Sequence, residues 1–217
     1  MDSILSLVIL VFSVIAHEVA HGYAANSLGD PTARLAGRLT LNPLPHIDLM
    51  GSVVIPALLV FTGSPILFGW AKPVPYNPFN LRNPHWGETL VAVAGSGTNI
   101  LLAVIFGLIV RVGSVPLATG DTLLSATALS LAATTAFINL FLGLFNLIPF
   151  PPLDGFTALR SALPWHLAPG LSRFEQQVRT AGALSLVLFL IIFSYIFATP
   201  FFHFVLWLFG LLTGGSI

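Results

Sequence analysis

Long apolar runs are the feature that most restricts what this chain can fold into. Candidate membrane-spanning runs lie at 4–25, 51–70, 89–112, 123–148 and 181–198. Their lengths are close to the length of about 20 residues that a helix needs to cross a bilayer. Only 7% of the residues are charged, against about 25% in a typical soluble domain. We therefore predict an all-α, multi-pass membrane protein.

Four of these runs are convincing spanning helices. We predict a three-helix core from the runs at 4–25, 89–112 and 123–148, with a C-terminal helix at 181–198. A sixth run, at 200–212, is short and begins at a proline. Gly95, Gly97 and Gly107 in the middle run suit the close packing of helices in lipid.

The run at 51–70 differs from the others because Pro56, Gly63 and Pro65 interrupt it. Backbone of this kind is tolerated within a membrane only where protein buries it. We predict that this run re-enters and leaves on the face where it began. The stretch 32–41 alternates loosely and predicts a short strand or hairpin, so residues 30–70 are expected to form a small β or re-entrant insertion.

The basic residues favour re-entry over a full crossing. With re-entry, all Lys and Arg residues except Arg111 lie on the face at which the first run ends, whereas a full crossing would divide them more evenly. The positive-inside rule then makes this face cytoplasmic, in the plasma membrane. A formal net charge of zero argues against nucleic acid as a partner.

The first apolar run contains His17, Glu18 and His21. Two histidines four residues apart lie on one face of a helix, so both can bind a single Zn²⁺ ion. Glu18, between them, is close enough to act on a water at the metal. Ionisable groups are costly within a membrane helix and mark function. The pattern therefore indicates a zinc-dependent hydrolytic site.

A catalytic zinc ion usually takes three protein ligands and a water, so a third ligand must come from elsewhere. With no cysteine in the chain, the candidates are Asp154, His46, Asp48, Asp30 and Asp121. Asp121 falls on the opposite face, and Asp30 lies between a glycine and a proline, which suits a turn. His46 and Asp48 precede the re-entrant run and could either approach the metal or cap that run. Asp154 has the best position, because prolines end the helix before it and Gly155 allows a close turn.

Four motifs follow one another along the chain: HEVAH at 17–21, FGWAKPVPYNP at 68–78, GSGTN at 95–99 and NLIPFPPLDG at 146–155. In this order they resemble the site-2 protease family of intramembrane zinc metalloproteases, in its compact prokaryotic subgroup without PDZ or CBS domains. The resemblance covers about residues 10–160. It implies one integral-membrane protease domain over 1–217, with a catalytic core at 10–160 and a helical extension at 161–217.

The resemblance implies that His17, His21 and Asp154 bind Zn²⁺ and that Glu18 is the general base. The implied activity is hydrolysis of peptide bonds within or near transmembrane segments of other membrane proteins. Such cleavage serves regulated intramembrane proteolysis or the clearance of membrane remnants. The expected partners are therefore those transmembrane segments and the lipid bilayer.

Two asparagines also match family motifs. Asn146 matches an asparagine implicated in holding the substrate backbone or the oxyanion, and Asn99 matches a residue of the middle helix that supports the site. We count both as substrate-binding candidates. The family commonly has proline where Ser96 stands and a second glycine where Phe156 stands.

Two other classes of function compete with proteolysis. In a transporter or ion-conducting bundle, the buried His, Glu and Asp residues would form an ion pathway, but no inverted repeat supports this. An inactive relative that binds membrane clients is a further alternative, and the intact set of His17, Glu18, His21 and Asp154 argues against it.

Overall fold

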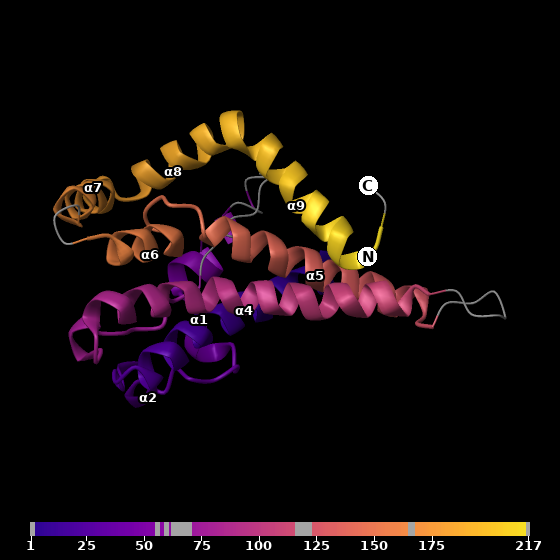
Figure 1. Ribbon diagram of the computed structural model, residues 1–217, viewed down its shortest axis with the longest axis horizontal. Coiled ribbons are helices and arrows are strands. Elements are labelled where there is room, and N and C mark those ends of the chain that lie inside the picture. Colours follow the sequence, from indigo (N-terminus) through magenta and orange to yellow (C-terminus); the bar gives the residue numbers. More distant parts are fainter. Residues whose placement is uncertain are drawn as a thin grey trace.

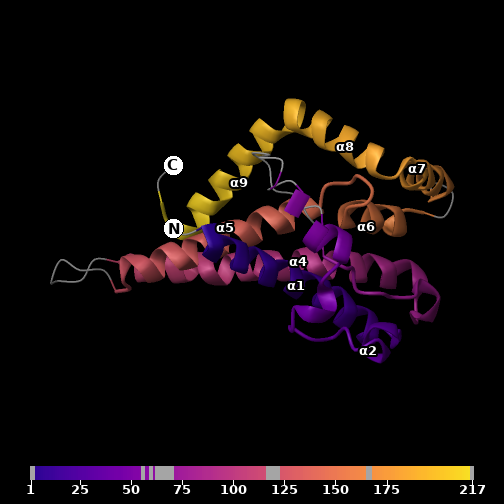
Figure 2. The same ribbon diagram turned by 180° about the vertical axis from the view of Figure 1, so that it is seen from behind.

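The computed structural model describes residues 3–54, 57–58, 61, 71–115, 123–164 and 168–215, and its regular structure is helical, with no strand in these ranges. Three long helices form the core: α1 (Ser3–Ser27), α4 (Pro84–Gly113) and α5 (Ala126–Asn146). They lie side by side, and α4 packs along both α1 and α5 (Figures 1 and 2). The predicted three-helix core is confirmed.

The three core helices alternate in direction. The Arg82 amide donates a hydrogen bond to the Leu28 carbonyl at 2.9 Å, which ties the start of α4 to the end of α1. Gly143 of α5 packs against Ser96 of α4, and a Cβ atom at Gly143 would lie 3.0 Å from the Ser96 carbonyl. The chain between α1 and α4 therefore returns to the face that it left, as re-entry requires, although residues 55–56, 59–60 and 62–70 of the predicted re-entrant run lie outside the described ranges.

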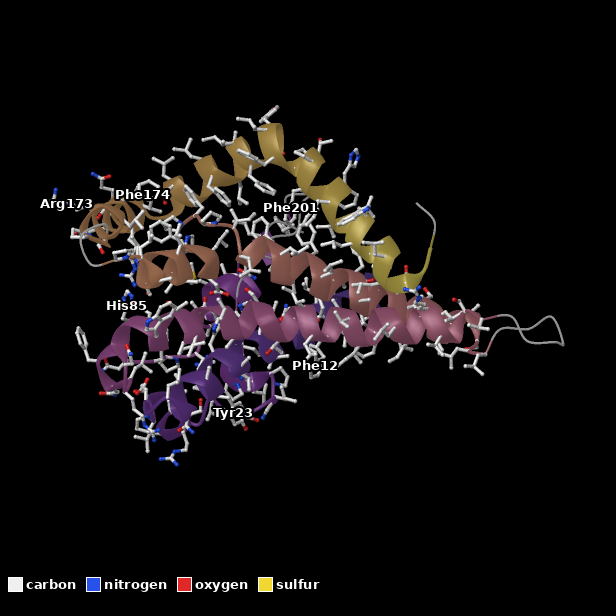
Figure 3. The ribbon with its side chains drawn as sticks, in the orientation of Figure 1. Phe12, Tyr23, His85, Arg173, Phe174 and Phe201 are labelled. Carbon is white, nitrogen blue, oxygen red and sulfur yellow. The ribbon has the colours of Figure 1, made fainter. Side chains whose placement is uncertain are left out.

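Four helical segments are long and apolar enough to cross a membrane: Ile4–Ser27, His85–Gly113, Ala126–Asn146 and Val187–Thr213. Many large apolar side chains on these helices are exposed, and Phe12 points away from the core (Figure 3). Lipid would cover these side chains in a bilayer. The protein is a multi-pass membrane protein.

The C-terminal segment is one bent span, which corrects the two runs predicted at 181–198 and 200–212. Helix α8 (Ala183–Ile192) continues through a π-helical turn, η4 (Phe193–Phe197), into α9 (Ala198–Thr213), with a bend that is plain in Figure 1. Pro200 does not end the helix because it lies in the first turn of α9, where a missing amide costs little. Phe201 packs between α9 and α5, 5.5 Å from Phe141 between ring centres (Figure 3).

The described part of the insertion contains α2 (Thr32–Leu35), η1 (Leu44–His46) and η2 (Leu49–Val54). A further short turn, η3 (Pro78–Asn80), lies between the insertion and α4. The strand predicted at 32–41 is wrong. The Asp30 carboxylate accepts from the Thr32 amide at 3.1 Å and starts a helical turn there, and Gly37, at φ 65°, ends it. This local side-chain hydrogen bond outweighs the weak alternation of the sequence.

Two further helices, α6 (Asp154–Ala162) and α7 (Ala168–Ala181), follow α5. Arg160 of α6 forms ion pairs with Glu88 of α4 and Glu175 of α7. Because all three side chains are largely buried, this network fixes α6 against the core. It thereby sets the position of Asp154, the first residue of α6.

Candidate metal centre

Helix α1 presents His17 and His21 from successive turns. Their Nε2 atoms lie 3.1 Å apart, and the ring centres lie 4.6 Å apart. His21 Nδ1 lies 2.7 Å from the Val91 carbonyl oxygen of α4. Because a carbonyl can only accept, Nδ1 carries the proton and Nε2 keeps its lone pair, which is the arrangement of a metal ligand.

Asp154 reaches the same point from the beginning of α6. Its Oδ2 atom lies 3.1 Å from His17 Nε2 and 3.4 Å from His21 Nε2. The next residue, Gly155, packs so closely on the preceding turn that a Cβ atom there would lie 2.1 Å from the Leu147 carbonyl oxygen. Only glycine permits this approach, so the expectation of a close turn at Gly155 is confirmed.

These three residues, which we call the metal triad, fit a zinc ion. Each offers one ligand atom, and the three atoms lie within 4.8 Å of one another. With zinc–ligand distances of about 2.0–2.1 Å, neighbouring ligands of a tetrahedral site are about 3.3 Å apart. The observed separations of 3.1, 3.1 and 3.4 Å agree with this spacing. Two nitrogen atoms and one carboxylate oxygen are also donors that zinc prefers.

Helix α4 forms one wall of the metal triad. A Cβ atom at Gly95 would lie 2.4 Å from His21 Nε2 and 2.8 Å from His17 Cε1, so the imidazoles occupy the space that a side chain would take. The adjacent Ser96 is fully buried, and its hydroxyl donates to Asp154 Oδ2 at 3.2 Å. Gly95 therefore makes room for the histidines, while Ser96 orients the carboxylate.

The environment of Asp154 favours its charged form. Burial by itself would raise the pKa of this carboxyl group. Without a metal ion, hydrogen bonds and positive charge from protonated His17 and His21 more than offset burial and hold the pKa of Asp154 well below its ordinary value. A carboxylate that stays ionised is suited to bind a cation.

Glu18 lies on α1 beside the metal triad. Its Oε2 atom accepts a hydrogen bond from the Val74 amide at 2.9 Å. Val74 belongs to the loop at 71–77, which lies within the motif noted at 68–78. The loop therefore holds the Glu18 carboxylate through a backbone hydrogen bond from outside α1.

The other candidates for the third ligand have different roles. His46 is buried within the insertion, where its Nε2 atom lies 2.9 Å from the Thr40 carbonyl oxygen. Asp48 accepts from the Gly51 amide at 2.7 Å and so caps η2. Asp30 holds the turn that precedes α2, and Asp121 lies outside the described residues.

The two predicted substrate-binding residues lie in different settings. Asn99 is fully buried on α4, and neither atom of its amide has a hydrogen-bond partner among the described residues. It lies one turn beyond Gly95, on the face that lines the metal triad. Asn146 is the last residue of α5, and its side-chain amide donates to the Leu142 carbonyl at 3.0 Å.

Sequence reasoning did not identify the contacts made by Val91, Ser96 and Val74. The spacing of Val91, Gly95 and Asn99 at intervals of four did contain a signal, because it places them on one face of a helix. The contact at Val74 could not be found this way, because its donor is a backbone amide.

Comparison with known proteins agrees with this geometry. The model of peptidase family M50 matches residues 5–190. A Bacillus subtilis protein named "Putative zinc metalloprotease YwhC" is 36% identical over 93% of this chain and 83% of its own length. Two relatives are named "Putative zinc metalloprotease Rip2". The protein from Mycolicibacterium smegmatis is 29% identical over 83% of this chain and 64% of its own length. The protein from Mycobacterium tuberculosis strain H37Rv is 30% identical over 92% of this chain and 70% of its own length. No solved structure is significantly similar to the chain.

Proposed function

The chain belongs to peptidase family M50, and from this premise we propose that the metal triad binds the catalytic zinc ion and that Glu18 is the general base. The protein is an intramembrane zinc metalloprotease of the site-2 protease type. The observation that carries the proposed roles is the convergence of three ligand atoms from α1 and α6.

A zinc ion in this position supplies a Lewis acid, which makes a water more acidic and polarises a peptide carbonyl. The chain's own residues prepare the site. Val91 sets the tautomer of His21, and Ser96 orients Asp154. Glu18 takes a proton from the attacking water and delivers it to the leaving nitrogen.

Asn99 and Asn146 hold the substrate in this proposal. A buried amide without a partner is costly, and the Asn99 amide would be satisfied by the backbone of a bound peptide. Asn146 is the last residue of α5, and the connection 147–153 leads from it to Asp154 at the start of α6. An extended substrate exposes the backbone groups that these amides can bind, whereas a helical substrate does not.

The substrates are transmembrane segments of other membrane proteins. His21 and His17 lie about 9 and 15 Å from the end of α1, at 1.5 Å per residue, so the site lies within the depth of the bilayer. A transmembrane segment is the peptide that reaches this depth. Because its peptide bonds are hydrogen-bonded within the helix, it must unwind locally before Glu18 and the metal triad can act.

The active site faces the cytoplasm in this proposal. The C-terminal ends of α1 and α5 and the N-terminal end of α4 share one face, and α6 and α7 extend from it. Every Lys and Arg residue of the chain except Arg111 lies beyond these ends. The positive-inside rule assigns such a face to the cytoplasm.

The test is cleavage of a panel of single-span helices by the purified protein in liposomes. Glu18→Gln is expected to lower turnover by about 10²- to 10⁴-fold, the contribution of a general base, while bound zinc measured by mass spectrometry is unchanged. A zinc chelator should abolish cleavage by the wild type. Undiminished cleavage by Glu18→Gln would show that another group is the base.

A further inference from the structure

A peptide group of the loop at 71–77 lies between a buried arginine and Glu18. The Val74 amide donates to Glu18 Oε2 at 2.9 Å. The Pro73 carbonyl, which belongs to the same peptide group, accepts from Arg38 Nη2 at 3.3 Å. The same Nη2 atom also donates to the Lys72 carbonyl at 2.6 Å. A single peptide plane thus joins a guanidinium to the carboxylate.

The proline residues of this loop isolate one donor. Because Pro73 and Pro75 have no amide proton, Val74 carries the sole backbone donor of the three. Proline also biases the residue before it toward an extended conformation, which applies to both Lys72 and Val74. The sequence KPVP therefore presents one N–H group on an extended backbone.

Contacts on both sides hold this donor in place. The Lys72 amide donates to the His46 carbonyl at 2.9 Å, and the Asn77 amide donates to Asp30 Oδ2 at 2.6 Å. The Val74 side chain is buried against α1, where a Cβ atom at Gly22 would lie 2.8 Å from Val74 Cγ1. Since Gly22 lies one turn after Glu18, the loop packs on the same face of α1 that carries the carboxylate.

Arg38 is the unusual member of this arrangement. It is only 7% exposed, yet no carboxylate among the described residues lies within ion-pair distance of it. A buried charge without a counterion is costly, and here the carbonyls of Lys72 and Pro73 partly compensate it. Hydrogen bonds in series polarise one another, so the guanidinium strengthens the donor that Val74 offers to Glu18.

We propose that Arg38 is a positioning residue for Glu18, acting through the peptide group of Pro73 and Val74. The guanidinium orients and polarises this group, which fixes the carboxylate in one orientation beside the metal triad. Arg38 touches neither substrate nor metal in this role. The inference rests on the general-base role proposed for Glu18.

The test compares Arg38→Ala with Arg34→Ala, an exposed arginine of the same segment, as the matched control. Arg38→Ala is expected to lower kcat by about tenfold to a hundredfold, the effect of one hydrogen bond to a charged group. KM and zinc affinity should stay at the wild-type values, and Arg34→Ala should behave as wild type. Wild-type kcat in Arg38→Ala, or equal losses of kcat and zinc affinity, would overturn the proposal.

Hydrogen exchange of the loop adds a readout that does not depend on activity. Because Pro73 and Pro75 lack an amide proton, exchange measured over 73–75 reports Val74 alone. In the metal-free protein, this amide should exchange at least about tenfold faster in Arg38→Ala than in Arg34→Ala. Equal protection in the two variants contradicts the proposed link.

A second pair of variants applies if Arg38→Ala does not fold. Val74→Pro removes the donor while Arg38 remains, and Val74→Ala keeps the donor while shortening the side chain. Val74→Pro should lower kcat by the same factor, whereas Val74→Ala should keep most of it. Full activity in Val74→Pro would refute the inference. Activity retained in Glu18→Gln would instead refute the proposed function, so the two failures are distinguishable.

Discussion

Replacement of Gly95 by alanine tests the geometry of the metal centre with a single methyl group. A Cβ atom at this position would lie 2.4 Å from His21 Nε2, 2.7 Å from His21 Cε1 and 2.8 Å from His17 Cε1. Ordinary van der Waals contacts begin at 3.4 Å. The imidazole of His21 must therefore move by about 1 Å, whereas zinc sites tolerate deviations of only about 0.2 Å in ligand distance.

The expected result is a loss of zinc in a protein that still folds. Alanine favours a helix over glycine by about 0.5–1 kcal/mol, so the substitution does not weaken α4 by itself. Even changes outside the ligand set lower metal affinity by about 10- to 100-fold, and a displaced ligand should cost at least the upper value. Cleavage should fall in proportion to the zinc that is lost.

Gly97→Ala is the matched control, because a Cβ atom at Gly97 meets no atom within 4 Å. The assay measures zinc content after chelator competition, thermal unfolding in detergent, and cleavage in liposomes for both variants. Gly97→Ala should keep its zinc and unfold at the wild-type temperature or slightly above it. Wild-type zinc affinity in Gly95→Ala would refute the geometry of the triad.

Two further predictions concern the turns that position the site. Gly155→Ala should abolish both zinc binding and cleavage. The added Cβ atom would lie 2.1 Å from the Leu147 carbonyl oxygen, and the backbone there cannot shift without moving Asp154. Wild-type zinc content in this variant would contradict the prediction. Burial by itself raises the pKa of Asp30, but hydrogen bonds from neighbouring side chains and amides outweigh burial and hold the pKa below its ordinary value of 3.8. The contribution of Asp30 to the free energy of unfolding is therefore complete above about pH 4 and is lost as the pH falls through the lowered pKa. Thermal unfolding between pH 3 and 7 should show a smaller decrease of the unfolding temperature in acid for Asp30→Asn than for the wild type.

The predictions from sequence were most accurate where the structure depends on residues that are close together in the sequence. Core helices α1, α4 and α5 follow from apolar runs of sufficient length. The spacing of His17 and His21 places them on one face because a helix repeats every 3.6 residues. Where two local tendencies competed, the sequence misled. The loose alternation at 32–41 suggested a strand, but the Asp30 carboxylate binds the Thr32 amide, and the residues that follow form the helical turn of α2.

Glycines show what a pattern leaves undecided. Gly95, Gly97 and Gly107 are equivalent in sequence as small residues that suit helix packing. In the structure, Gly95 faces the imidazoles, Gly107 faces Leu212 of α9, and Gly97 faces nothing within 4 Å. Which neighbour a helical position meets depends on how the helices are rotated and paired, and the sequence of a single helix determines neither property.

By itself, the sequence determined the three core helices and placed His17 and His21 on one face of α1, because both depend on the geometry of a single helix. Only the tertiary structure joined Asp154 to the two imidazoles among several candidate ligands. It likewise brought the loop amide of Val74 to Glu18. These contacts join residues far apart in the chain. They exist because the antiparallel packing of α1, α4 and α5 brings the ends of those helices to one face.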